Sequence, residues 1–347
     1  MNRRNFSKIT ATSSLGILPF LTNANSSIPD EFWKQKKPKR LKKGDTIGLI
    51  TPGSFISDEG LNTAVEHVES LGFKVQLGKN IRAKRGFNAG TDVQRLEDLH
   101  GMFSDRNING VWCARGGYGC GRILQGIDYQ LIKRNTKALI GYSDITALLL
   151  AIYKKTEMIG FHGPVAASDF TDYTVAHFQK IVMEPQADFL IKPAIENLKN
   201  EDSIYHSKTI VSGKARGKLI GGNLSLLASL AGTDFAPDFK NKIVFIEDIG
   251  EKPYRIDRML TQLRQGTNLK AAKGIALGIF ADCEAPAASN SLTLLETLTD
   301  RLGDLKIPVV YGLSFGHIAN QMTLPIGVEA ELNADDFMLK ILETAVE

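Results

Sequence analysis

Short apolar runs alternate with amphipathic segments along most of the chain. Residues 46–50 (TIGLI) end in a turn of sequence TPGS, and this pattern predicts a buried strand. Residues 61–71 repeat apolar side chains every three or four positions up to Gly72, which predicts a helix with one buried face. Apolar runs at 110–114 and 138–140 continue the alternation. Alternating strands and helices predict an α/β fold with a mostly parallel sheet and helices on its faces.

A second helix is predicted to begin just after Thr91. Thr91 and Gln94 have the spacing of a capping box, in which each side chain accepts a hydrogen bond from the other residue's backbone N–H. The residues expected on the buried face of this helix are Val93, Leu96, Leu99 and Phe103.

The second half of the chain has a mixed pattern. Polar residues gather between about residues 170 and 208, so we place a domain boundary there. Residues 322–342 alternate apolar and polar positions, which predicts antiparallel strands. This half is therefore predicted to be mixed α/β. Its other predicted elements are strands at 213–219, 243–246 and 275–280, a turn at 221–223, and helices at 224–230 and 256–263.

The amino terminus resembles an export signal. Arg3 and Arg4 precede a mildly apolar stretch at residues 9–21, as in twin-arginine signals. The stretch contains Thr, Ser, Gly and Pro, and it is shorter than the roughly 20 apolar residues that a membrane span needs. We therefore expect twin-arginine export to the periplasm and no stable membrane span. The predicted organisation is a signal at 1–24, a basic linker at 25–43, an N-terminal domain at 44–170, a linker region at 171–208 and a C-terminal domain at 209–347.

Charge and cysteine content narrow the class of protein only slightly. The net charge is +4 over 347 residues and falls to +1 without the first 24, so it gives no argument for nucleic-acid binding. The basic run at 34–43 is interpreted as a solvated tether rather than a contact for nucleic acid or lipid. Three cysteines are too few, and odd in number, for a disulfide framework.

Ser143 is a candidate nucleophile. The segment Gly141-Tyr142-Ser143-Asp144 lies between an apolar strand and an apolar helix, so the hydroxyl is expected above the sheet edge, near free backbone amides. Ile145 stands where the nucleophile elbow has its last glycine. The alternative role for Ser143 is to cap the following helix.

A serine hydroxyl needs a positioned base to act as a nucleophile. Of the six histidines, His162 and His317 each follow a predicted strand, where a side chain reaches the sheet edge. Position alone does not separate these two candidates, and either one is also explained as a structural histidine.

Glu247 is a candidate for the acid that orients the base. It ends the apolar run at 243–246, and a carboxylate at the tip of a buried strand needs a partner such as an imidazole N–H. A salt bridge to Arg255 or Arg258 is the alternative explanation.

Five separate groups of motifs then occur in a recognisable order. They are RGGYG at 115–119, GYSD at 141–144, GGNL at 221–224, ED at 247–248 with PYR at 253–255, and GLSFGH at 312–317 with TLP at 323–325. Together they resemble the serine LD-carboxypeptidase family, which includes the microcin-C-immunity peptidases. The resemblance covers residues 44–342, essentially the whole chain after the predicted signal and linker.

The resemblance implies a fold and a set of site residues. The expected fold is α/β, with a flavodoxin-like N-terminal domain and a C-terminal domain that resembles a swivelling β-barrel, and family members pair as homodimers. Carried over by motif, the nucleophile is Ser143, the orienting acid is Glu247 and the base is His317, which decides between the two histidines. The implied oxyanion donors are the backbone amides of Gly117 and Asp144, and the further substrate-binding residues are Arg115 and Asn223.

The implied activity is acyl transfer without a metal or other cofactor. The substrate is a murein tetrapeptide-like peptide, cut between an L-configured centre and a terminal D-amino acid. Alternatives are a peptidase for microcin-C-type peptide–nucleotide conjugates, a non-catalytic muropeptide-binding protein, and a thiol enzyme that uses Cys113 or Cys120.

Overall fold

The structure is a computed structural model that describes residues 35–286 and 289–347. The predicted export signal at 1–24 and the start of the predicted basic linker lie outside the described residues. Within the described residues, no helix is long and apolar enough to cross a bilayer.

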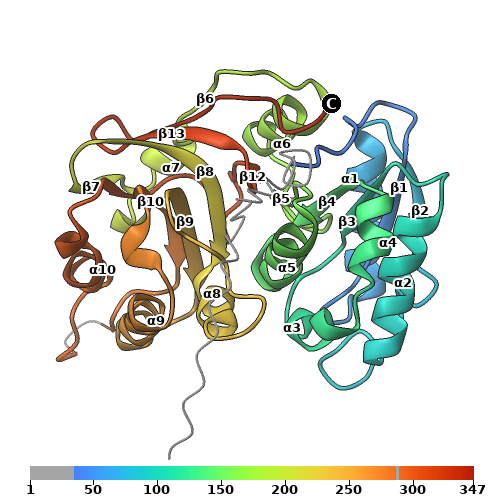
Figure 1. Cartoon of the computed structure of the whole chain (residues 1–347), viewed down its shortest axis with the longest axis horizontal. Helices are drawn as coiled ribbons and strands as arrows, with labels where there is room; N and C mark the ends of the chain where they lie inside the picture. Colours follow the sequence, from blue (N-terminus) through green and yellow to red (C-terminus); the bar gives the residue numbers. More distant parts are fainter. Residues whose placement is uncertain (1–34, 287–288) are drawn as a thin grey trace, which may run out of the picture. The chain divides into compact units, whose positions relative to one another are not determined.

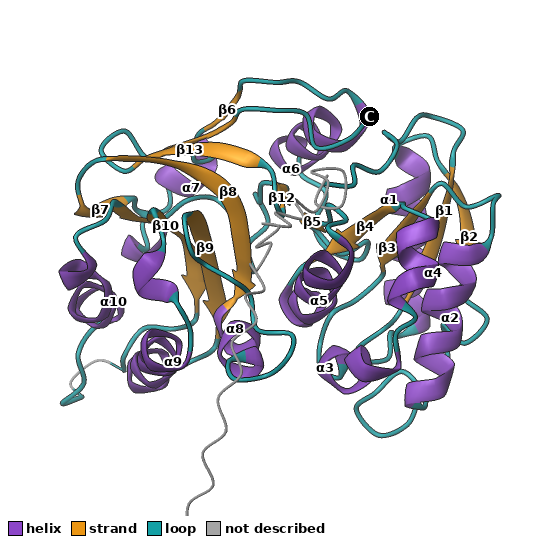
Figure 2. Cartoon of the chain, in the orientation of Figure 1, coloured by secondary structure: helices purple, strands orange, loops and turns teal. Residues whose placement is uncertain are grey.

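The first sheet has six strands, five of which are parallel in the order β2-β1-β3-β4-β5. This is the flavodoxin-like order, in which β1 and β3 lie at the point where the sheet changes its direction of growth. The predicted flavodoxin-like α/β layer is therefore confirmed (Figures 1 and 2). The strands are β1 (Thr46–Ile50), β2 (Lys74–Leu77), β3 (Gly110–Cys113), β4 (Ala138–Gly141) and β5 (Phe161–His162).

The sixth strand of this sheet comes from the far end of the chain. β12 (Leu324–Pro325) pairs antiparallel with β5, so that Leu324 lies opposite His162. The C-terminal domain predicted at 209–347 thus contributes a strand to the N-terminal sheet.

Five helices accompany the first sheet, and three of them begin at a side-chain cap, including the fourth, where the Asp128 side chain accepts from the N–H of Leu131. The Ser57 side chain accepts a hydrogen bond from the N–H of Gly60, and Thr91 forms the predicted capping box with Gln94. The prediction that Val93 is buried is wrong, because it lies roughly 120° around the helix from Leu99 and is 73% exposed. The helices are α1 (Asp58–Ser70), α2 (Asp92–Ser104), α3 (Cys120–Ile123), α4 (Tyr129–Arg134) and α5 (Thr146–Thr156).

The second sheet has eight strands in the order β6-β14-β13-β8-β9-β10-β11-β7. Its four central strands β8 to β11 are parallel, and the others pair antiparallel, so the predicted mixed α/β pattern is confirmed. The strands are β6 (Phe189–Ile191), β7 (Lys208–Val211), β8 (Lys214–Asn223), β9 (Lys242–Ile249), β10 (Gly274–Ala281), β11 (Val309–Tyr311), β13 (Glu329–Asn333) and β14 (Met338–Ile341). The helices that follow β8, β9 and β10 are α8 (Leu224–Leu230), α9 (Pro253–Gly266) and α10 (Leu294–Leu302).

The predicted turn at residues 221–223 is instead the end of strand β8. A Cβ on Gly221 would lie 1.9 Å from the carbonyl oxygen of Phe245 on β9. Gly221 therefore serves close approach of two strands rather than a reversal of the chain.

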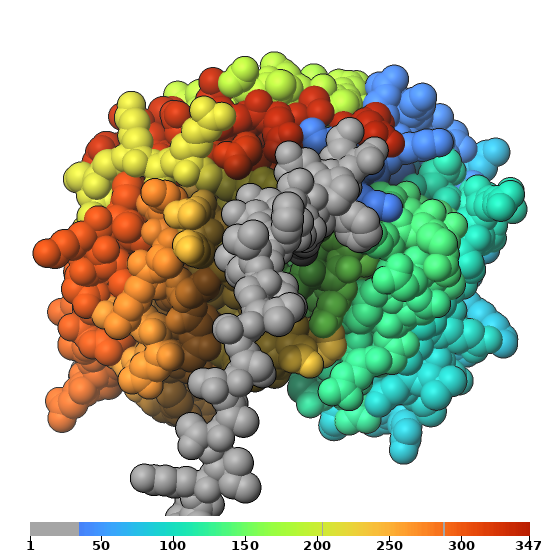
Figure 3. Space-filling view, viewed as in Figure 1, coloured from blue at the N-terminus to red at the C-terminus, as the bar shows by residue number. Residues whose placement is uncertain are grey.

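The predicted linkers are part of the folded structure where they are described. The N–H of Lys36 donates to Glu157, the N–H of Leu41 donates to Val182, and Leu41 is only 1% exposed. The interpretation of this run as a solvated tether is therefore wrong for residues 36–41. Figure 3 shows the blue segment after residue 35 beside the red C-terminal segment. There the backbone N–H of Arg40 donates to the carbonyl oxygen of Glu347.

The region predicted as a linker at 171–208 also forms regular structure. It contains α6 (Asp172–Phe178), a π-helical turn at Gln179–Met183, strand β6 and α7 (Ile195–Leu198). The polar composition of this region reflects short surface elements, of which β6 forms one edge of the second sheet.

Candidate active site

Three side chains from distant parts of the sequence are joined by two consecutive hydrogen bonds. Ser143 follows β4, Glu247 lies on β9, and His317 lies on the segment that joins β11 to β12. The Nε2 atom of His317 is 3.0 Å from the Oγ of Ser143, and its Nδ1 is 2.8 Å from the Oε2 of Glu247. The structure thus brings together the three residues that the resemblance singled out.

Ser143 has an unusual backbone conformation for a residue with a side chain. Its φ is +61°, in the left-handed region, where a non-glycine residue costs about 1–3 kcal/mol. A Cβ on Gly116 would lie 3.2 Å from the Cβ of Ser143 and 3.4 Å from the N of Asp144. The loop after β3 therefore passes directly against the turn that carries the serine, as in a sharp strand-to-helix elbow.

Glu247 is completely buried, with an exposed fraction of 0%. The chain of the β11–β12 segment runs close to it, since a Cβ on Gly316 would lie 3.2 Å from the Oε2 of Glu247. Burial alone would lower the pKa of His317, but the charge of Glu247, its hydrogen bond and the charge of Asp248 together raise that pKa. The buried carboxylate thus favours a charged imidazole at position 317.

His162 is not part of this line of hydrogen bonds. It is 1% exposed, and its ring packs edge-on against Phe245 and Tyr142, with centroids 5.2 and 6.0 Å away. Neither ring nitrogen has a hydrogen-bond partner in the described chain. Burial lowers the pKa of His162 to about 4, so the ring is neutral near pH 7.

The loop after β3 carries Gly117, one of the two predicted oxyanion donors. The N–H of Ser54 donates to the carbonyl of Gly116 (2.9 Å), and the N–H of Tyr118 donates to the Oγ of Ser54 (3.0 Å). The N–H of Cys120 donates to the Oδ2 of Asp144 at 2.8 Å. These contacts hold the loop beside Ser143, and Gly117, Ser143 and Asp144 all line one cavity.

The other two predicted site residues have different positions. Arg115 is exposed, donates to the carbonyl oxygen of Phe55 at 2.9 Å, and is not among the residues that line the cavity. Asn223 does line the cavity, but its Oδ1 caps α8 and its Nδ2 donates to Asp248 at 3.0 Å. The structure therefore gives Asn223 a scaffold contact and places Arg115 outside the cavity.

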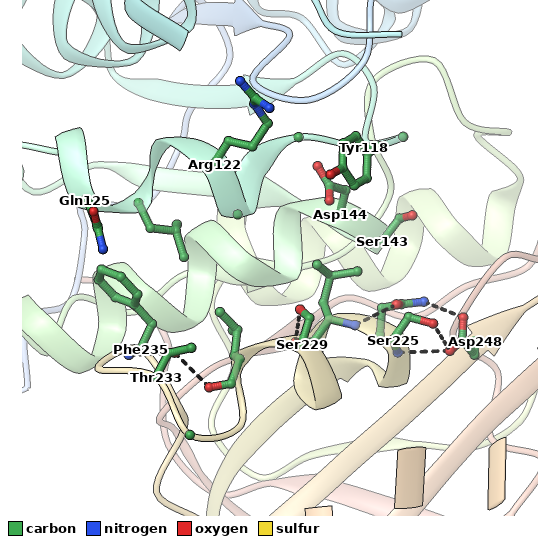
Figure 4. Close-up of a pocket in the computed structure, with 18 of the residues that line it drawn as sticks. Tyr118, Arg122, Gln125, Ser143, Asp144, Ser225, Ser229, Thr233, Phe235 and Asp248 are labelled. Carbon is green, nitrogen blue, oxygen red and sulfur yellow. Dashed lines mark hydrogen bonds between the residues drawn. The ribbon is translucent and has the colours of Figure 1, made fainter. Parts of the chain in front are cut away.

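The cavity has a volume of about 920 Å³. Figure 4 shows Tyr118, Asp144 and Ser143 on one side of it and Ser225 and Asp248 on the other. Burial, and secondarily the neighbouring Glu247, raises the pKa of Asp248 to about 6. The sequence reasoning missed Asp248 as a cavity residue. The available signal was its place beside Glu247 near the end of an apolar strand, where a buried carboxylate needs polar partners.

The thiols lack the features of a catalytic cysteine. Cys113 and Cys120 are fully buried, and burial together with nearby Asp144 raises the pKa of both thiols. A reactive cysteine has the opposite properties, namely exposure and a lowered pKa. Within the described chain, no three His, Cys, Asp or Glu side chains are grouped so as to hold a metal ion.

Three features define the class of protein as a two-domain serine hydrolase of mixed α/β structure. They are the flavodoxin-like layer, the second mixed sheet and the hydrogen-bonded Ser-His-Glu triad. Residues 47–163 match the LD-carboxypeptidase N-terminal domain, and residues 216–332 match the LD-carboxypeptidase C-terminal domain. The chain therefore belongs to the LD-carboxypeptidase family, as the sequence motifs predicted.

Relatives match over most of their own length. The probable murein peptide carboxypeptidase of Bacillus subtilis is 41% identical over 304 residues, which cover 86% of this chain and 91% of the relative. The crystal structure of muramoyltetrapeptide carboxypeptidase from Oxalobacter formigenes is 30% identical, with a TM-score of 0.74, and covers 86% of this chain and 99% of that one. The structure of microcin C7 self-immunity protein MccF in complex with aspartyl sulfamoyl adenosine is 28% identical, with a TM-score of 0.80, and covers 90% and 100%.

Proposed function

We propose that this protein is a serine LD-carboxypeptidase that removes a terminal D-amino acid from murein peptides. The observation that carries the proposal is the line of hydrogen bonds from Ser143 through His317 to Glu247, at 3.0 and 2.8 Å. Membership of the LD-carboxypeptidase family and the murein peptides named for its relatives support the choice of substrate.

In the proposed mechanism, His317 takes the proton of Ser143 as the oxygen attacks the scissile carbonyl carbon. The departing amine of the D-amino acid receives that proton from Nε2, which leaves an acyl group on Ser143. Water then releases the acyl group by the same steps in reverse. Glu247 fixes the ring through Nδ1 and stabilises the imidazolium that forms in each half of the reaction.

The negative charge on the carbonyl oxygen needs donors that are already in place. We propose the backbone N–H groups of Gly117 and Asp144 for this role, because both residues line the cavity beside Ser143. Such donors stabilise the transition state more than the ground state, and loss of one typically costs about 10²–10³ in kcat.

The proposal is tested by incubating the purified protein with a murein tetrapeptide and, separately, with an aminoacyl-nucleotide conjugate. The second substrate tests the alternative suggested by the structural similarity to MccF. We expect loss of one D-alanine from the tetrapeptide, seen by mass spectrometry, and no turnover by Ser143→Ala. Ligand-induced thermal stabilisation with neither substrate cut would contradict the proposal and favour a binding protein.

We also propose that the protein works in the periplasm as a homodimer after twin-arginine export. Arg3 and Arg4 with the following apolar stretch support the export route, and the family resemblance supports pairing. Cell fractionation of the full chain and of an Arg3→Lys, Arg4→Lys double variant tests the route, since the variant should stay in the cytoplasm. Light scattering on the purified protein tests the pairing.

A further inference from the structure

Arg95 on α2 is a buried arginine that the proposed mechanism does not use. It is only 2% exposed, and buried guanidinium groups are rare because removing their charge from water is costly. Its Nη1 donates to the carbonyl oxygens of Pro52 at 2.6 Å and Gly119 at 2.8 Å. Its Nη2 donates to the Oδ1 of Asp92 at 2.5 Å.

The two carbonyl groups belong to the two loops that flank the site. Pro52 lies in the loop after β1, and Gly119 lies in the loop after β3. These are the neighbouring strands at which the parallel sheet changes its direction of growth, where ligands bind in folds of this kind. One guanidinium nitrogen therefore joins the two loops.

The loop after β3 has little stiffness of its own. Three of the five residues from 115 to 119 are glycines, and Gly117 and Gly119 have φ values of +85° and +126°. Its position therefore depends on contacts with neighbours. Ser54 holds its start, Asp144 accepts the N–H of Cys120 after its end, and Arg95 holds the carbonyl of Gly119 between them.

We propose that Arg95 is a positioning residue for the oxyanion site. By binding the carbonyl oxygens of Pro52 and Gly119, it fixes the position of the Gly117 N–H relative to the Ser143 hydroxyl. The inference rests on the proposed function, since it assigns Arg95 to the loop that would hold the oxyanion. Arg95 itself is not expected to touch the substrate, because it is only 2% exposed and does not line the cavity.

Asp92 balances the charge of Arg95. It accepts from Nη2, so Nη1 keeps its two hydrogen bonds to the carbonyl oxygens of Pro52 and Gly119. Asp92 is 39% exposed in its side chain and also accepts bonds from the Nε and Nη2 of Arg122, both at 3.1 Å. The hydrogen bond from Arg122, and after it that from Arg95, lowers the pKa of Asp92 in spite of partial burial. The carboxyl group of Asp92 therefore stays ionised at the pH of an activity assay. The effect of Arg95 on the reaction should accordingly not depend on pH.

The test compares Arg95→Met, which keeps the length of the side chain but not its donors, with Arg95→Lys, which keeps one donor group. We expect Arg95→Met to lower kcat about 10²-fold with KM within about threefold, the range for loss of one oxyanion donor. Arg95→Lys should fall between Met and wild type. The pH profile of kcat/KM should keep its acid limb, since the Ser-His-Glu triad is untouched.

A tetrahedral boronate inhibitor gives a readout that a general loss of stability would not move. Its affinity should fall in parallel with kcat/KM in the Arg95 variants, whereas the affinity for the product peptide should not change. The matched control is Arg82→Met, since Arg82 is a surface arginine paired with Asp58 and 58% exposed in its side chain. It should behave as wild type.

Two results from steady-state kinetics and inhibitor binding would overturn the inference: Arg95→Met with near-normal kcat, or boronate affinity unchanged while kcat/KM falls. If Arg95→Met does not fold, Arg95→Lys decides by the same two readouts. The rate at which a fluorophosphonate labels Ser143 separates the two proposals, because it needs the oxyanion donors but no particular peptide. A wild type that is neither labelled nor active defeats the proposed function, whereas equal labelling of wild type and variant defeats the role of Arg95.

Discussion

Two histidines lie near Tyr142 and differ in their hydrogen bonds and in their pKa values. The ring centroid of His317 is 4.8 Å from that of Tyr142, and the ring centroid of His162 is 6.0 Å from it. His317 has a hydroxyl on one nitrogen and a carboxylate on the other, and its pKa is raised. Among the residues that the structure describes, His162 has no hydrogen-bond partner on either ring nitrogen, and burial lowers its pKa to about 4.

The comparison of His162 with His317 shows that a position near Glu247 does not by itself make a histidine a catalytic base. The charge of Glu247 acts to raise the pKa of both histidines, but for His162 it is outweighed by burial. Only His317 adds a direct hydrogen bond to the carboxylate. The direct bond also fixes the tautomer, leaving Nε2 free to accept the serine proton.

Replacing His317 with Ala should give the largest effect in this comparison. We expect kcat to fall by about 10³–10⁶, the range for loss of a residue from a Ser-His-acid unit, because Ser143 then lacks a base. Steady-state kinetics with a murein tetrapeptide measures it, and thermal unfolding checks that the fold persists. Turnover within tenfold of wild type would show that another group removes the serine proton.

Replacing Glu247 with Gln should make the surroundings of His317 more like those of His162. The base works when neutral, so kcat/KM rises with pH through its pKa, and the raised pKa of His317 puts that acid limb above pH 6.5 in the wild type. Without the carboxylate the limb should move to lower pH, while kcat falls by about 10²–10⁴. A limb that stays in place would mean that the carboxylate does not set the pKa of His317.

Replacing Asp248 with Asn tests the more distant charge. Asp248 also raises the pKa of His317, but it is the last of the four influences on that pKa and has no hydrogen bond to the ring. We therefore expect a smaller shift of the acid limb to lower pH and a loss in kcat of less than about tenfold. Asp58→Asn is the control, since it removes a carboxylate that is 80% exposed and pairs with Arg82 at the surface.

Replacing His162 with Phe should have the smallest effect on activity, with kcat within about threefold of wild type. Its ring nitrogens are buried without partners, so an apolar ring of similar size should be neutral or stabilising. The lowered pKa means that the unfolded chain binds a proton below about pH 6.5 that the folded chain refuses until about pH 4.

The stability difference between His162→Phe and wild type should therefore widen as pH falls from 7 to 4. Thermal unfolding at several pH values measures it. A tenfold loss of kcat in this variant would contradict the passive role that the comparison assigns to His162.

Local patterns were sufficient to predict most of the fold. The capping box at Thr91, the apolar strands and the alternating tail all follow from residues close together in the sequence. Predictions failed where long-range contacts decide the structure. Basic residues at 36–41 are held by backbone bonds to Glu157 and Val182, and Gly221 lies in a strand because Phe245 passes close by.

The site shows the same division. Ser143, Glu247 and His317 could be assigned because motifs carry them, although spacing alone left His162 as an equal candidate. Arg115 shares a motif with Gly117, yet its side chain donates to the carbonyl oxygen of Phe55 and does not line the cavity. Arg95 gave no signal, because an arginine within an amphipathic helix is ordinarily on its solvent side.

The pairing of β12 with β5 has a consequence for how the molecule is made. His317 lies on the segment that crosses from β11 in one sheet to β12 in the other, near the end of the chain. During synthesis the hydroxyl of Ser143 is complete long before its imidazole partner exists. A growing or truncated chain that stops before residue 317 therefore lacks the base and cannot cut peptides, and catalytic competence requires that the segment leading to β12 has been made.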